Sequence, residues 1–310
     1  MPAVLFHSVN DSPADWEISL SKLIPNLDFR IWPDIGNPLD IEFALIWALP
    51  PGSLKPMTNL RCICSLGQGV DHIFRDAELP KEAKIMRLVD PWMAQAMSEW
   101  VLLNILRFHR QGIDYEAFER ERRWCVLPPP ETSQRKVGIL GLGALGADAA
   151  KKIAALGFDV AGWSKSHKEI KNVKSFYGDN QLGAFLNRSD ILCCLLPLTH
   201  ETTGILNKQT LNQLPSGAFI INAGRGPHVV DEDLLKAIDD GQIAGAALDV
   251  FHEEPLPSEH PYWLHPKVRV WPHVSAQSNA GSAAAQVADA ISKVFSGEEP
   301  NNLINRKNQY

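Results

Sequence analysis

Short apolar runs separated by polar or helical segments recur through the first third of the chain. They lie at residues 3–6, 29–32, 43–47, 62–66 and 85–88. Runs of four or five apolar residues that alternate with helical segments are typical of a parallel β-sheet. This part of the chain is therefore predicted to form an α/β unit.

A second series of apolar runs begins at residue 137. Its members lie at residues 137–140, 160–163, 191–196, 218–222, 244–250 and 268–271. We expect a second parallel sheet from this series. The strongly apolar residues 97–108 predict a buried helix joining the two units, and residues 120–135 a charged, proline-rich loop before the second unit. The alanine-rich residues 275–295 predict a C-terminal helix.

A glycine turn separates the first two runs of the second series. The run at 137–140 leads into GLGALG (residues 141–146), and an amphipathic segment closed by Gly157 follows. Strand, glycine turn, helix and strand in this order are the arrangement of a dinucleotide-binding fold. In that arrangement Gly141 permits the tight turn, Gly143 lets the backbone approach a pyrophosphate, and Gly146 lets the helix pack on the strand. Ala144 and Leu145 lie at the helix N-terminus, whose N–H groups and dipole favour phosphate.

The residues after the second strand of this motif bear on the choice of nucleotide. An Asp or Glu about 20 residues past the glycines usually binds a ribose 2′-hydroxyl. Here the chain reads Ser164-Lys165-Ser166-His167-Lys168, which offers hydroxyls and ammonium groups and no carboxylate. We therefore predict that NADP(H) is preferred, with NAD(H) possible, while a solvated surface turn is the alternative reading of these lysines.

Composition narrows the class of protein. The 310 residues are enough for two domains, and 45% hydrophobic with 21% charged residues is ordinary for a globular protein. A net charge of −6 gives no basic field for nucleic acid or an anionic membrane, and no apolar run is long enough to span a bilayer. We expect neither partner.

Five cysteines, two of them adjacent in an apolar run, indicate reduced thiols in a cytoplasmic protein. Cys62 and Cys64 lack the spacing and the partners of a zinc site, so we expect no metal.

Three residues with complementary chemistry follow successive strands. Arg225 comes after the run at 218–222, Glu254 after 244–250 and His273 after 268–271. Chemistry in open parallel sheets gathers at the carboxyl ends of strands. Arginine can hold a carboxylate through a bidentate fork, histidine can exchange a proton near neutral pH, and a carboxylate can orient the imidazole. These residues are consistent with a reductase site, although loop ion pairs without function would give the same pattern.

At these residues the chain resembles the D-isomer-specific 2-hydroxyacid dehydrogenases over essentially its whole length. The matching segments are GLGALG, LLPLTHETTGILN, INAGRGPHVVDEDLL, ALDVFHEEPLP and WPHVSA. Through ALIWALPP, SLGQGVDHI, GWSKS and DVFHEEPLP the likeness is closest to the bacterial glyoxylate/hydroxypyruvate reductase A subgroup.

The resemblance implies an activity and a set of site residues. A hydride from NADPH would reduce a small 2-oxoacid such as glyoxylate or hydroxypyruvate. Arg225, Glu254 and His273 match the catalytic triad, with Glu253 as the alternative carboxylate, His273 donating a proton and Arg225 holding the substrate carboxylate. Positions matching the family's cofactor contacts are Leu195, Pro197, Thr203, Ala223 and Asp249, and those matching its substrate contacts are Trp47, Gly69, Val70 and Met93.

The resemblance also implies a domain arrangement. It predicts two Rossmann-like, doubly wound α/β domains: a discontinuous substrate domain (residues 1–98 and 276–310) with an inserted dinucleotide-binding domain (99–275). The active site would lie in the cleft between them. Family members are usually homodimers built on the cofactor domain, with the loop around Trp124 near the interface. Two alternatives stay open: a reductase for a bulkier 2-oxoacid, and a nicotinamide-sensing, corepressor-like binding protein.

Overall fold

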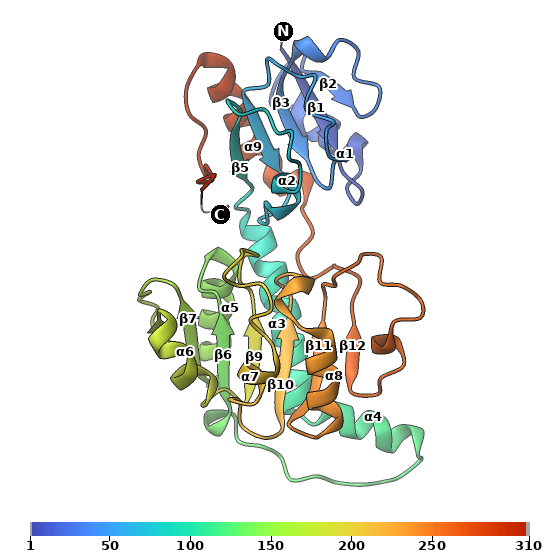
Figure 1. The fold of residues 1–310 in the computed structure, drawn as a ribbon, viewed down its shortest axis with the longest axis vertical. Helices are drawn as coiled ribbons and strands as arrows, with labels where there is room; N and C mark the ends of the chain where they lie inside the picture. The colour runs from blue at the N-terminus through green and yellow to red at the C-terminus, as the bar shows by residue number, and fades with distance from the viewer. Residues whose placement is uncertain (1, 308–310) are drawn as a thin grey trace. The chain divides into compact units, whose positions relative to one another are not determined.

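The computed structural model describes residues 2–307, which divide into two compact units. Unit 1 is formed by the chain up to Met93 together with the segment from Gln277 onward, and unit 2 is Ala94–Ala276. Figure 1 shows the two units and their elements. Within residues 2–307 no helix is long and apolar enough to cross a membrane.

Unit 1 is built on a five-stranded parallel sheet. Its strands are β1 (Ala3–His7), β2 (Asp28–Ile31), β3 (Ile41–Ile46), β4 (Cys62–Ser65) and β5 (Lys84–Arg87), in the order β2-β1-β3-β4-β5. The predicted strands are all present, with ends that differ by a few residues. This order reverses direction between β1 and β3, so the carboxyl ends of those two strands form the switch point where α/β sheets bind ligands.

Side-chain alternation gives the sheet of unit 1 two buried faces. One face packs against α1 (Pro13–Ser21) and α9 (Ala280–Ser296) and contains Phe6 and Phe43. The other face is covered by the segment around Leu54 and by α2 (Asp71–Phe74), with Ile63 at its centre. Asn279 caps the N-terminus of α9 through its side chain, and Gly297 ends the helix in a left-handed conformation.

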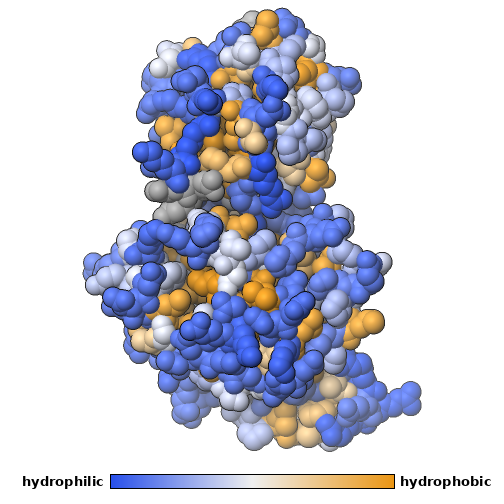
Figure 2. Space-filling view, in the orientation of Figure 1, coloured by the Kyte–Doolittle hydropathy of each residue, from blue (hydrophilic) through white to orange (hydrophobic). Residues whose placement is uncertain are grey.

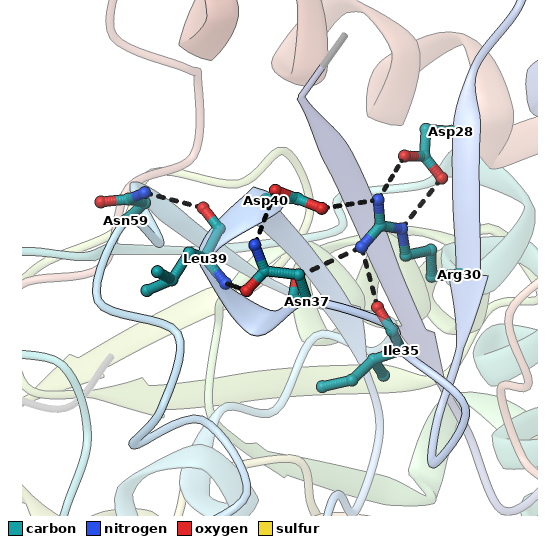
Figure 3. A network of polar contacts seen from close by, with 7 residues as sticks. All are labelled: Asp28, Arg30, Ile35, Asn37, Leu39, Asp40 and Asn59. Carbon is teal, nitrogen blue, oxygen red and sulfur yellow. Dashed lines mark hydrogen bonds and ion pairs between the residues drawn. The ribbon is translucent and has the colours of Figure 1, made fainter.

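A polar network secures the connection between β2 and β3 (Figure 3). Both terminal nitrogens and Nε of Arg30 are used: Nε and Nη2 contact the carboxylate of Asp28 at 3.0 and 2.7 Å, and Nη2 also contacts Asp40 at 3.1 Å. Nη1 donates to the carbonyl oxygens of Ile35 and Asn37. One guanidinium thereby holds the connection between β2 and β3 through two carboxylates and two carbonyl oxygens.

Unit 2 is built on a seven-stranded parallel sheet. The strands are β6 (Lys136–Leu140), β7 (Asp159–Ser164), β8 (Lys174–Tyr177), β9 (Ile191–Cys194), β10 (Ala218–Asn222), β11 (Ile243–Leu248) and β12 (Val268–Val270). They are ordered β12-β11-β10-β9-β6-β7-β8, the doubly wound order with its switch point between β6 and β9. The pattern of apolar runs does not predict β8, because this short edge strand is only partly buried and has no apolar run.

Helices cover both faces of the sheet in unit 2. On one face α3 (Pro91–His109), the buried helix expected at 97–108, packs beside α5 (Ala144–Ala155). On the other face lie α6 (Asp179–Leu186), α7 (Lys208–Leu211) and α8 (Asp231–Asp239). The segment expected as a loop at 120–135 follows α4 (Gly112–Arg120) and contains one short 3₁₀ turn, Thr132–Gln134. The protein is an α/β protein with two parallel sheets.

Candidate active site

The glycine turn lies at the switch point of unit 2, between the end of β6 and the start of α5. Gly141 has φ +99°, and a Cβ atom there would lie 2.7 Å from the carbonyl oxygen of Leu195, at the end of the neighbouring β9. A Cβ atom on Gly146 would overlap the carbonyl oxygen of Gly141. Glycine is therefore required at both positions for the turn to close against the sheet.

Gly143 differs from the other two glycines because the space around it is open. No atom lies within 4 Å of the position that its Cβ would take, and its φ of −73° suits any residue. As the N-cap of α5 it offers no side-chain acceptor to the N–H groups of the first turn, which includes Ala144 and Leu145. Open space beside unoccupied helix N–H donors is what a pyrophosphate requires, so this turn fits a dinucleotide.

The segment proposed for the nucleotide's 2′ position ends β7. Ser164 is buried and its hydroxyl donates to the carbonyl oxygen of Ser166 at 2.7 Å. Lys165 is exposed, and its Nζ contacts the carboxylate oxygens of Glu201 at 2.9 and 3.2 Å. Residues 164–168 contain no carboxylate, but the fold brings the carboxylate of Glu201 to Lys165 from a separate loop. Lys165 would have to exchange this surface partner to bind a phosphate, at small cost because exposed ion pairs contribute about 0–1 kcal/mol.

The other expected cofactor positions follow strands next to the glycine turn. Leu195 and Pro197 follow β9, and Ala223 follows β10. Thr203 is exposed, and its hydroxyl donates to the carbonyl oxygen of Thr199 at 2.8 Å.

The carboxyl ends of β11 and β12 bring His273 and Glu254 together. Nδ1 of His273 lies 2.7 Å from Oε2 of Glu254, and Oε1 of Glu254 accepts the N–H of Phe251 at 2.9 Å. Both carboxylate oxygens therefore have donors. Because the carboxylate can only accept, Nδ1 of His273 carries a proton. Glu253 and Glu254 are both exposed residues, and the hydrogen bond from His273 goes to Glu254.

The electrostatics of Glu254 link it to Arg225. Burial raises the pKa of the Glu254 carboxyl, but the hydrogen bond and charge of His273, the Phe251 N–H and the charge of Arg225 together hold it below its usual range. Arg225 itself follows β10, and its Nη1 donates to the carbonyl oxygen of Gly224 at 2.7 Å. An arginine, a carboxylate and a histidine thus converge at one end of the sheet of unit 2.

Asp249 holds the backbone that carries His273. The side chain of Asp249 is fully buried, and its two carboxylate oxygens accept the N–H groups of Val274 and Ser275 at 2.8 and 2.9 Å. Its carbonyl oxygen accepts the N–H of His273 at 2.9 Å. His273 has φ +54°, an uncommon conformation for a residue with a Cβ, which these bonds stabilise. Sequence reasoning did not find this role, because the acidic residue and the loop that it anchors are 25 residues apart.

A second histidine near the triad in sequence, His252, is engaged elsewhere in unit 2. Its Nε2 lies 2.8 Å from the carbonyl oxygen of Val229 and 3.7 Å from the carboxylate of Asp231. The described residues 2–307 contain no group of three His, Cys, Asp or Glu side chains that could hold a metal ion.

The residues matched to substrate contacts belong to unit 1. Trp47 follows β3 at the switch point, and Gly69 and Val70 end the turn after β4. A Cβ atom on Gly67 would lie 2.6 Å from the Trp47 ring, so the indole packs directly on this turn. Met93 is buried in the first turn of α3.

Comparison with known proteins places the chain among sequences of one family. The model of the D-isomer specific 2-hydroxyacid dehydrogenase NAD-binding domain matches residues 102–275. The chain is 38% identical over 306 residues to glyoxylate/hydroxypyruvate reductase A of Serratia proteamaculans, covering 97% of each chain. It is also 38% identical to the protein of the same name from Klebsiella pneumoniae, over 100% of both chains.

Solved structures agree with the sequence comparison. A D-isomer specific 2-hydroxyacid dehydrogenase from Xanthobacter autotrophicus, crystallised with NADPH and MES, is 39% identical with a TM-score of 0.95, over 100% of this chain and 99% of that one. An NADPH-dependent glyoxylate/hydroxypyruvate reductase from Sinorhizobium meliloti, in complex with NADP and sulfate, is 35% identical with a TM-score of 0.92, over 99% and 100% of the chains.

Proposed function

Because the chain belongs to the D-isomer specific 2-hydroxyacid dehydrogenase family, we propose that it is an NADPH-dependent reductase of small 2-oxoacids, with glyoxylate and hydroxypyruvate as substrates. The names of its full-length relatives support this choice of substrate. The observation that carries it is the pair of His273 and Glu254, 2.7 Å apart beside the charge of Arg225. The three side chains supply a proton donor, its orienting base and a carboxylate-binding cation at the end of a dinucleotide-binding sheet.

His273 is the general acid of the reduction. Glu254 fixes the ring through Nδ1, so the proton transferred to the developing alkoxide comes from Nε2. The negative charge of Glu254 stabilises the imidazolium before the transfer. When bound, the reduced nicotinamide supplies the hydride that reduces the keto carbon.

Arg225 and the turn after β4 bind the substrate. The guanidinium of Arg225 presents a planar fork to the carboxylate and helps to polarise the ketone. The backbone N–H groups of Gly69 and Val70 are further donors to the carboxylate, and Trp47 and Met93 bound the substrate's carbon chain. Residues 1–98 and 276–310 are accordingly the substrate domain, and 99–275 the cofactor domain.

The cofactor preference follows from the end of β7. Lys165 and Ser166 provide donors for a 2′-phosphate, and Ser164 provides one once its hydroxyl turns away from the Ser166 carbonyl oxygen. Asp249 is the family position beside the nicotinamide amide. NADPH is therefore the preferred cofactor, with NADH as a poorer one. Relatives crystallised with NADPH or NADP support this preference.

Location and assembly are further parts of the proposal. We propose a reducing cytoplasm as the location, which suits the free thiols of Cys62, Cys64, Cys125, Cys193 and Cys194. The chain acts as a homodimer through the cofactor domain, where Trp124 is 98% exposed.

A panel of 2-oxoacids assayed with NADPH and NADH tests the function. We expect turnover of glyoxylate and hydroxypyruvate, with kcat/KM higher for NADPH and most of the difference in KM. Ser164→Asp with Lys165→Ser places a carboxylate where the phosphate would bind and should shrink or invert the preference. Tight NADPH binding without turnover of any 2-oxoacid would contradict the proposal and favour a nicotinamide sensor. Turnover limited to bulky 2-oxoacids would reject the substrates named here.

Arg225→Lys separates substrate binding from cofactor binding on the same enzyme. Lysine keeps the charge but loses the planar fork, so KM for 2-oxoacids should rise and kcat should fall. The Kd for NADPH, followed by fluorescence, should change little. Loss of both properties together would mean that Arg225 maintains the fold or the cofactor site.

A further inference from the structure

His72 links the two strand ends of unit 1 at which the substrate-binding residues lie. It is located on α2, and its Nδ1 lies 3.3 Å from the backbone nitrogen of Ala48, just after β3. Its Nε2 lies 3.0 Å from the hydroxyl of Ser65, the last residue of β4. One imidazole therefore connects the switch point to the turn that contains Gly69.

The chemistry of the partners fixes where the protons lie. The N–H of Ala48 can only donate, so Nδ1 of His72 accepts and the ring is the neutral Nε2–H tautomer. Nε2 then donates to the hydroxyl of Ser65. The Ser65 hydroxyl in turn donates to the carbonyl oxygen of Gly69 at 2.7 Å, and it accepts the N–H of Gly67 at 3.3 Å.

Ser65 is fully buried, so the chain of bonds is shielded from water. It holds the turn at two points, Gly67 and Gly69. Because the carbonyl of Gly69 belongs to the same peptide plane as the N–H of Val70, the bond from Ser65 sets the direction in which that N–H points. The orientation of one proposed substrate donor thus depends on His72 through a single intervening hydroxyl.

The ring of His72 also contacts Trp47. Their ring centroids are 4.4 Å apart, and the indole packs on Gly67 from the same side of the turn, since a Cβ atom there would meet it at 2.6 Å. Ala48, which donates to His72, has φ +54°, a costly backbone for alanine. The hydrogen bond to His72 thus stabilises the strained backbone of Ala48, the residue after Trp47.

We infer that His72, as the neutral Nε2–H tautomer, is the positioning residue that sets the Val70 amide and the Trp47 ring for 2-oxoacid binding. It acts through Ser65 and Trp47 and does not take part in proton transfer. This inference rests on the proposed function, because it assigns His72 a role in binding that substrate.

Three variants test the inference. His72→Phe keeps a ring against Trp47 but removes both hydrogen bonds, and Ser65→Ala removes the link to Gly69 while leaving His72 in place. Each should raise KM for glyoxylate roughly tenfold, the effect of one lost buried hydrogen bond, with a smaller fall in kcat. His72→Gln carries an amide NH₂ near the position of Nε2 and should recover much of the lost KM. The Kd for NADPH should be unchanged in all three.

Arg75→Ala is the matched control, because Arg75 is an exposed side chain at the end of the same helix, 3.4 Å from Asp71. Its KM and its melting temperature should equal those of the wild type. Wild-type KM in folded His72→Phe and Ser65→Ala enzymes would overturn the inference, as would a glutamine variant no better than phenylalanine. Should His72→Phe fail to fold, Ser65→Ala decides alone. Absence of 2-oxoacid turnover in the wild type would instead reject the proposed function.

Discussion

At the scale of residues, the active site depends on a few side chains that hold others. Asp249 anchors the loop that carries His273, and Glu254 fixes the ring of His273 while the Phe251 N–H fixes Glu254. The proposed general acid thus has a backbone and a ring orientation that are both set by acceptors. Orientation by a fixed network lowers the reorganisation needed when the proton moves.

Glu254→Gln tests the charge of this network through pH. The pKa of Glu254 is lowered in the folded protein, so the stability that it contributes is present above its usual value of 4.5 and is lost as pH falls through the folded pKa. The variant should therefore melt below the wild type near pH 7, and the difference between the two melting temperatures should shrink as pH falls below 4.5 and vanish below the lowered pKa of Glu254. A constant difference across this range would show that lost packing, and not the charge, explains the effect. The kcat of Glu254→Gln should also be lower than that of the wild type. For His273→Ala we expect a kcat loss of about 10²–10⁴.

At the scale of elements, the switch points of the two sheets lie beside the glycine turn of unit 2 and beside Trp47 of unit 1. In unit 2 the glycine turn follows β6 and the Leu195 carbonyl follows β9, the strands on either side of the reversal. In unit 1 the reversal between β1 and β3 places Trp47 beside the turn after β4. In unit 2 the backbone N–H groups lie at the reversal itself, and in unit 1 they lie on the turn after β4, the strand next to the reversal.

Gly143→Ala tests the cofactor site without changing the packing of the protein. A methyl group there meets no atom of the protein, so the melting temperature should not fall. The same methyl group occupies the open side of the turn, and the Kd for NADPH should rise about tenfold, or about 1.4 kcal/mol. Gly183→Ala on α6 is the control and should leave the Kd unchanged. Gly146→Ala should instead destabilise unit 2, because its Cβ would overlap the Gly141 carbonyl. Unchanged NADPH affinity in Gly143→Ala would place the pyrophosphate elsewhere.

At the scale of the whole molecule, the proposed homodimer would cover apolar residues that are exposed in a single chain. Trp124 and Val126, in the segment after α4, are 98% and 80% exposed. Apolar residues also gather near α4 at the lower end of unit 2 in the view of Figure 2. Large side chains this exposed are typical of interfaces.

Light scattering on the double variant Trp124→Ser with Val126→Ser tests the dimer. The wild type should have twice the 34.4 kDa mass of one chain at micromolar concentration, and the variant should have the mass of one chain. Val9→Ser, which replaces an exposed residue of unit 1, is the control and should stay dimeric. A wild type with the mass of one chain would refute the dimer.

The sequence by itself determined the two α/β series and the glycine turn, and it pointed to Arg225, Glu254 and His273 as candidate site residues. These follow from local causes: apolar runs that must be buried, glycines that a backbone conformation requires, and residue types that directly follow strands. The edge strand β8 could not be predicted, because its partly exposed side chains form no apolar run.

Only the tertiary structure decided which distant residues meet. It brought Glu201 to Lys165, joined Asp249 to the loop after β12, and placed His72 between Ser65 and Ala48. A hydrogen bond between residues far apart in sequence leaves no trace in local composition, because each partner is an ordinary polar residue until the sheet order brings the strand ends together.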